Sequence, residues 1–152
     1  MKFWVGITDN RWYNYLALRS AAEVNFWQPS ARRPFTNLPE GTPFLFKLKA
    51  PYNHIAGGGF FTRFTTMPLA TAWNAFGTEN GAESLQAFGR LIETNATTPA
   101  GSNPEIGCSI LTNVFYLPRE RWINMSAVLP RTGIMQGKTF DTDVREHADV
   151  WN

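Results

Sequence analysis

The chain has 152 residues, 43% of them hydrophobic and 17% charged, with a formal net charge of +2, so we expect residues 1–152 to form one domain with a buried core. The weak positive charge permits contact with a phosphate backbone, but without a basic tail it does not indicate one. The single cysteine, Cys108, excludes an internal disulfide. The sequence shows no membrane span and no apolar leader at its start, and we expect a cytoplasmic protein.

The first forty residues predict a strand, a helix and a long loop. Residues 2–8, "KFWVGIT", are β-branched and aromatic, as is typical of a strand. Asp9 or Asn10 can then cap a helix that runs to about Ser20. Residues 21–42 are rich in Pro, Arg, Asn and Gly, and they predict a loop.

A β-hairpin is predicted next. "PFLFKLKAP" places Phe44, Phe46 and Leu48 on one face, which indicates a strand with one buried side. "IAGGGFFTRF" predicts its antiparallel partner. The three glycines at 57–59 favour a bulge or a close approach of two backbones.

The second half predicts two helices followed by a long strand. Apolar spacing indicates helices over residues 69–76 and 85–93, and Asn80 with Glu83 resembles a capping box for the second. Residues 94–104 predict an exposed loop.

"IGCSILTNVFY" predicts a strand that ends before Pro118, and Trp122 with Ile123 begins a short extended piece. Residues 131–152 contain turn residues and few apolar anchors. The pattern therefore predicts an α+β fold: a twisted, partly closed barrel of about five or six strands, with two or three helices inserted.

The segment "NFWQPSARR" combines side chains suited to binding a nucleobase. Adjacent aromatic residues can stack on a base, which is worth about 1–3 kcal/mol per base. The flanking amides can offer a donor and an acceptor to a Watson–Crick edge, and the arginine pair can bind phosphates. We expect a base pocket formed by Asp9, Asn10, Trp12, Asn25, Phe26, Trp27 and Gln28, and phosphate contacts from Arg32, Arg33, Lys47, Lys49 and Arg63.

Structural roles compete with each of these assignments. The aromatic residues can belong to the core, Asp9 and Asn10 can act only as helix caps, and the basic residues can be solvated surface groups. Both interpretations stay open for every residue of the set.

Catalytic and metal-binding patterns are missing from the sequence. His54 and His147 are far apart, and no zinc-ligand spacing exists. "GKT" at 137–139 does not complete a P-loop, because Thr132 occupies the place of the first glycine. We expect no metal, no cofactor and no catalytic residue, and therefore a binding domain.

Five stretches of the chain carry a resemblance to a known family. "KFWVGITDNRWYNYL", "EVNFWQPS", "LPEGTPFLFKLKAPYNHIAGGGFF", "PEIGCSILTNVFYLP" and "IMQGKTFD" together resemble the N-terminal domain of HNH-type restriction endonucleases. That domain looks like a member of the PUA-like superfamily, which includes the SRA, EVE, YTH and ASCH domains. The "GTPFLFKL…IAGGGFF" hairpin is similar to a hairpin of EVE domains.

The resemblance implies a small barrel whose cleft accepts one flipped base. It implies recognition of double-stranded DNA that carries a modified cytosine, and a downstream HNH nuclease domain in the parent protein. This chain has no such nuclease segment, so a truncated piece and a standalone reader both stay open. A homodimer also stays open.

Two other classes of function remain as alternatives. ASCH-type members of the superfamily are similar in fold and act on acylated cytidine with a Lys, a Thr and a Glu. Lys47, Lys49, Thr8 and Glu23 could supply such a set. The other alternative is a protein-interaction module of a defence system.

Overall fold

The computed structural model describes residues 2–35, 38–124 and 137–141. In these ranges, seven strands form one mixed sheet in the order β2-β5-β4-β3-β1-β7, and β6 pairs with β4 outside this path. The strands are β1 (Lys2–Thr8), β2 (Val24–Gln28), β3 (Pro43–Leu48), β4 (His54–Pro68), β5 (Glu105–Tyr116), β6 (Ile123–Asn124) and β7 (Gly137–Asp141).

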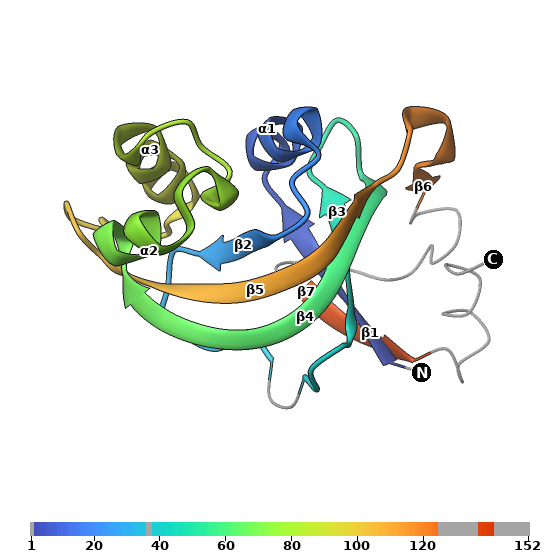
Figure 1. Cartoon of the computed structure of the whole chain (residues 1–152), viewed down its shortest axis with the longest axis horizontal. Coiled ribbons are helices and arrows are strands. Elements are labelled where there is room, and N and C mark those ends of the chain that lie inside the picture. Colours follow the sequence, from blue (N-terminus) through green and yellow to red (C-terminus); the bar gives the residue numbers. More distant parts are fainter. Residues whose placement is uncertain (1, 36–37, 125–136, 142–152) are drawn as a thin grey trace.

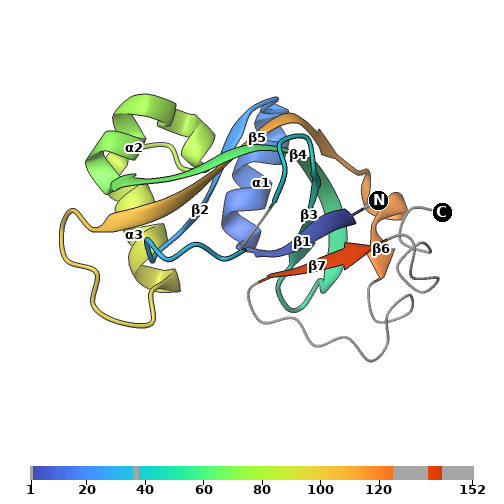
Figure 2. The same cartoon turned by 90° about the horizontal axis from the view of Figure 1, so that it is seen from below.

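Helices cover one side of this sheet and one of its ends. They are α1 (Asn10–Arg19), α2 (Leu69–Phe76) and α3 (Leu85–Asn95), with 3-10 turns η1 (Gly77–Asn80) and η2 (Arg119–Arg121). The long strands β4 and β5 bend strongly, and α1 lies over the concave side of the bend (Figure 1). Helices α2 and α3 lie together at the end of the sheet near β2 (Figure 2). The predicted α+β fold is confirmed, with β2 and β7 added to the predicted strands.

Local sequence signals set the boundaries of α1. The carboxylate of Asp9 accepts hydrogen bonds from the backbone N–H groups of Arg11 and Trp12, so Asp9, of the two predicted candidates, is the cap. Ser20 ends the helix in the left-handed conformation, with φ of 48°. The side chains of Trp12 and Leu16 are buried and close the concave side of the sheet.

The β3–β4 hairpin confirms the prediction for the glycine run. The two strands are antiparallel and their register shifts between Phe46 and Lys47. A Cβ atom at Gly57 would lie 2.3 Å from the backbone oxygen of Phe115 on β5. Only glycine allows β4 and β5 to approach this closely, because that distance is far inside van der Waals contact.

Two predictions for local structure are wrong. The loop predicted over 21–42 contains β2, which pairs with β5 from Val24 opposite Leu111 to Gln28 opposite Gly107. The pairing with β5 supplies hydrogen-bond partners for the backbone of β2, and apolar side chains are buried on both faces of β2. The predicted capping box also fails, because Ser84 rather than Asn80 caps α3.

The C-terminal part of the chain adds an edge to the sheet. No strand was predicted in the tail, where Phe140 is one of the few apolar anchors, but β7 pairs antiparallel with β1 and buries Phe140. His147 and Thr132 lie outside the described residues. No helix in the described ranges is both long enough and apolar enough to cross a membrane.

Candidate functional site

A cavity of about 260 Å³ opens on the concave side of the sheet, where β1 ends and α1 begins. Its volume is close to the lower end of the ~300–1,000 Å³ that is usual for small-molecule sites. Predicted pocket residues in its wall are Asp9, Trp12, Phe26, Trp27 and Gln28, and Lys49 joins them from the predicted phosphate set. The wall is completed by Trp4, Ile7, Thr8, Pro29, Pro34, Phe44, Asn95 and Ser109.

Aromatic rings form one wall of the cavity. The ring of Phe26 lies 4.7 Å from that of Phe44 and 5.2 Å, edge to face, from that of Trp12. The indole N–H of Trp27 donates to the backbone oxygen of Asn80 at 2.8 Å. These contacts hold the rings in fixed positions, so this wall is rigid and apolar.

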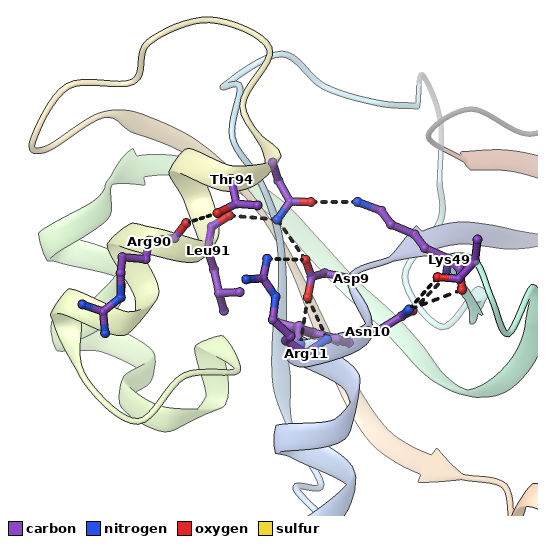
Figure 3. Close-up of polar contacts among 10 residues, drawn as sticks. Asp9, Asn10, Arg11, Lys49, Arg90, Leu91 and Thr94 are labelled. Atoms are coloured by element: carbon purple, nitrogen blue, oxygen red, sulfur yellow. Dashed lines mark hydrogen bonds and ion pairs between the residues drawn. The ribbon is translucent and has the colours of Figure 1, made fainter.

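Hydrogen bonds between three distant segments form a polar part of the cavity wall. The Asn95 amide nitrogen, at the end of α3, donates to the Asp9 carboxylate at 3.0 Å and to the Leu91 backbone oxygen at 2.8 Å. The Asn95 side-chain oxygen accepts a hydrogen bond from Lys49 Nζ at 2.8 Å. In Figure 3, Asp9 at the start of α1 and Lys49 after β3 approach this network from two sides.

The Asp9 carboxylate is fully engaged by donors. Burial raises its pKa, but hydrogen bonds from Asn95, the Trp12 backbone and Arg11 outweigh that effect, so the pKa lies below the ordinary value of 3.8. Arg11 also makes an ion pair with it at 3.3 Å. Asp9 is therefore ionised at neutral pH and has little acceptor capacity left for a ligand.

Two further polar groups line the cavity with hydrogen-bonding capacity to spare. Ser109, on β5, is only 3% exposed, and its hydroxyl has no hydrogen-bond partner in the described part of the chain. The amide nitrogen of Gln28 donates to the backbone oxygens of Ser30, at 3.0 Å, and Arg32. Among the described residues no group donates to the side-chain oxygen of Gln28.

A second, more polar cavity of about 500 Å³ adjoins the first. Gln28, Pro29, Pro34 and Asn95 belong to the walls of both cavities. Arg32 and Arg33 line only the second, together with Ser30 and Thr97. The structure therefore places the predicted arginine pair directly beside the aromatic cavity.

Four predicted residues line neither cavity. Asn10 instead binds the backbone of residues 49–50, accepting from the Lys49 N–H at 2.9 Å and donating to the Lys49 and Ala50 oxygens. Lys47, on β3, and the exposed Arg63, on β4, lie elsewhere on the sheet.

Asn25 is the fourth, and it is fully buried on the other face of β2. Its amide nitrogen donates to the side-chain oxygen of Asn80 at 2.9 Å and contacts Cys108 Sγ at 3.3 Å. Burial raises the pKa of the Cys108 thiol, with a smaller opposing effect of the contact from Asn25.

Sequence reasoning missed several residues of the cavity. Trp4 and Phe44 look like ordinary core residues in the sequence, while Asn95 and Ser109 carry no motif. The inward-facing alternation of β5 was the only available signal for Ser109, since Ser109 is directly opposite Phe26.

The alternative hydrolase set is only partly assembled. Thr8 and Lys49 line the cavity, whereas Lys47 does not and Glu23 is exposed elsewhere. The Thr8 hydroxyl donates to the Gly6 backbone oxygen at 3.0 Å. Within the described ranges, no three His, Cys, Asp or Glu side chains group as a metal site would require.

Comparisons with known proteins show the fold. No protein-family model matches the chain, and no match was found among curated proteins. The fold is similar to crystal structures of the ASCH protein of Zymomonas mobilis. A tyrosine-to-phenylalanine mutant gives a TM-score of 0.65 at 12% identity, covering 99% of this chain and 96% of that one. The unmutated protein gives 0.64 at 9% identity, covering 97% of this chain and 93% of that one.

A serine-to-alanine mutant of the same protein gives 0.63 at 11% identity, covering 97% of this chain and 92% of that one. The chain therefore has the PUA-like fold of ASCH domains. That part of the sequence resemblance is confirmed, while the SRA-like, EVE-like and HNH-associated parts gain no support.

Proposed function

We propose that this chain is a nucleic-acid-binding module that takes one unstacked base into the aromatic cavity. The observation that carries the proposal is the joining of a rigid aromatic wall, spare hydrogen-bonding groups and an arginine-lined second cavity at one place. The PUA-like fold is consistent with it. In the finer form of the proposal, the base is a modified cytosine flipped out of duplex DNA, read for an HNH nuclease domain of the parent protein.

The energetics favour a cavity of this composition. Extruding a base from a duplex costs a few kcal/mol in lost stacking and pairing. Contact with an aromatic wall returns about 1–3 kcal/mol per base. Phe26 and Trp12 provide part of that wall, and Ser109 and Lys49 can bind polar groups on the edge of the base.

The arginine pair would bind the phosphates that flank the base. Arg32 and Arg33 are both exposed, and the guanidinium of Arg33 lies 5.3 Å from the centre of the Phe64 ring, which supports its side chain. Each phosphate contact of this kind adds affinity at low salt and makes the affinity fall more steeply as the salt concentration rises.

The test is a titration of short DNA and RNA duplexes that carry one cytosine, plain, methylated or hydroxymethylated, at fixed salt. Phe26→Leu, in the cavity, is compared with Phe60→Leu, which removes a 36% exposed ring on β4. We expect modification-dependent binding that only Phe26→Leu weakens, by about tenfold. Equal effects of the two substitutions would contradict a base pocket at this cavity.

A matched pair of arginine variants tests the phosphate contacts. Arg33→Gln is expected to weaken binding to all duplexes and to lower the slope of log affinity against log salt by about one. Arg63→Gln removes the same charge from an exposed position outside both cavities and is expected to leave the slope unchanged. An unchanged slope in both variants would place the phosphate surface elsewhere.

A hydrolase of an acylated nucleoside is the second candidate, because Thr8 and Lys49 line the same cavity. The state of Asp9 argues against it, since a carboxylate with a lowered pKa and four donors is a weak general base. Release of acetate from N4-acetylcytidine, abolished by Lys49→Met, would establish the hydrolase. Absence of both nucleic-acid binding and acetate release would favour the protein-interaction module instead.

A further inference from the structure

The side chain of Gln28 is held in one orientation at the boundary between the two cavities. Its amide nitrogen donates to the backbone oxygens of Ser30 and Arg32. Carbonyl oxygens can only accept, so the nitrogen and oxygen of this amide cannot exchange places. The nitrogen faces the 30–32 turn, and the oxygen is on the opposite arm of the amide.

Packing against β5 restricts Gln28 further. Gly107 is directly opposite Gln28 in the β2–β5 pair. A Cβ atom at position 107 would lie 2.9 Å from Gln28 Cγ and 2.9 Å from the Ser30 backbone oxygen. The side chain of Gln28 therefore lies flat over a glycine, and its amide is positioned before any ligand arrives.

Ser109 extends the same face. It is two residues along β5 from Gly107, so it points to the same side of the sheet as Gln28. Its hydroxyl can donate or accept, whereas the oxygen of Gln28 can only accept. Lys49 Nζ, in the polar part of the wall, can only donate.

We infer that Gln28 selects a base with an exocyclic amine, such as cytosine or adenine, against a base with a carbonyl at that position. This inference rests on the proposed base-binding function. An amine donates to the Gln28 oxygen, while a carbonyl would place two acceptors against each other and leave both without a donor. Discrimination comes from this mismatch, because polar groups that the bound base covers lose their hydration without replacement.

Amine and carbonyl bases of equal size provide the direct test. Each duplex carries one test base opposite an abasic position, so that no pairing has to be broken. The pairs are cytosine with uracil and adenine with hypoxanthine. A duplex that lacks the test base measures the affinity that does not depend on the base. We expect the amine member of both pairs to bind at least about tenfold more tightly.

Variants assign the preference to Gln28. Gln28→Met keeps the length of the side chain and removes the acceptor, so the ratio within each pair should fall to about one. Ser109→Ala should weaken binding of both members and keep the ratio. Ser30→Ala removes the hydroxyl that accepts from the Arg32 N–H at 3.1 Å, and it should leave the ratio unchanged because the Ser30 backbone oxygen remains.

Gly107→Ala gives an independent route, because the added methyl group displaces Gln28 and the Ser30 backbone oxygen that holds its amide, without changing the chemistry of Gln28. It should reduce the ratio within each pair while the protein stays folded.

Different results would separate this inference from the proposed function. Equal binding of cytosine and uracil, both tighter than the abasic duplex, would overturn the role of Gln28 and retain the base pocket. A preference that survives Gln28→Met would do the same. Equal binding of base-bearing and abasic duplexes would overturn the base pocket itself.

Discussion

The two faces of β2 carry the same kinds of side chain, but these side chains have different roles on each face. Phe26 and Gln28 point to the concave side of the sheet and line the cavity. Asn25, on the other face, lies between the sheet and η1, where its amide binds Asn80. An amide on one face is thus open to a ligand, while an amide three residues away belongs to the interior of the fold.

The difference teaches that strand parity, rather than residue type, separates the binding amide from the structural amide of β2. Asn80 connects the structural side: its amide nitrogen donates to the backbone oxygens of Ala72 and Gly77 at 3.0 and 2.9 Å. Its backbone oxygen accepts from the Trp27 indole. Trp27 also lines the cavity, so its hydrogen bond to Asn80 links the structural network to the cavity wall.

The largest effect is expected from Asn80→Ala. The substitution removes the donor to the buried Ala72 and Gly77 oxygens and leaves the Asn25 amide nitrogen with only its contact to Cys108 Sγ, so the free energy of unfolding should fall by about 2–4 kcal/mol. Denaturant unfolding at constant slope measures it. Asn74→Ala, at an exposed position of α2, is the control and should change stability by less than about 0.5 kcal/mol. A loss as small as the control's would mean that the network does not stabilise the fold.

A smaller effect, dependent on pH, is expected from Asp9→Asn. The pKa of Asp9 is lowered in the folded protein, so its charge contributes stability that is present above its unfolded pKa, about 3.9. That contribution is lost as pH falls through the folded pKa. The variant should therefore be less stable than the parent by about 1 kcal/mol near pH 7, and the difference should shrink below about pH 4.

Unfolding curves at several pH values give the measurement, with Glu83→Gln, an exposed carboxylate, as control. A difference that stays constant across this range would show that the network at Asp9 does not depend on its charge.

The sequence predicted those parts of the fold that local patterns specify. The N-cap at Asp9, the β3–β4 hairpin and the close approach at Gly57 follow from short-range residue chemistry. Strand β2 was missed because a short strand with polar residues, followed by Pro29, has the composition of a loop. Its pairing partner on β5 is 79 to 87 residues away, from Gln28 with Gly107 to Val24 with Leu111, so no local signal marks it.

The cavity was predictable only where its residues are close together in the sequence. Phe26, Trp27 and Gln28 were found because they form one run with the arginines. Asn95 was not found, because it reaches Asp9 across 86 residues through the packing of α3. Asn25 was assigned to the pocket by residue type alone, and only the parity of β2 places it on the opposite face.

The smallest effect on stability is expected from Gln28→Met, which sharpens the comparison between the two amides. Gln28 is only half-buried, and its amide binds the backbone of an exposed turn that water can also reach, so the free energy of unfolding should change by less than about 1 kcal/mol. Removal of the Gln28 amide should nevertheless abolish the preference for an amine-bearing base. Asn80→Ala should do the reverse: it should lower stability strongly, while the protein that remains folded keeps the preference. Unfolding curves and titrations on the same two variants measure both quantities. If Gln28→Met lowered stability as much as Asn80→Ala, or if Asn80→Ala removed the preference in folded protein, the two faces of β2 would not be separable in function.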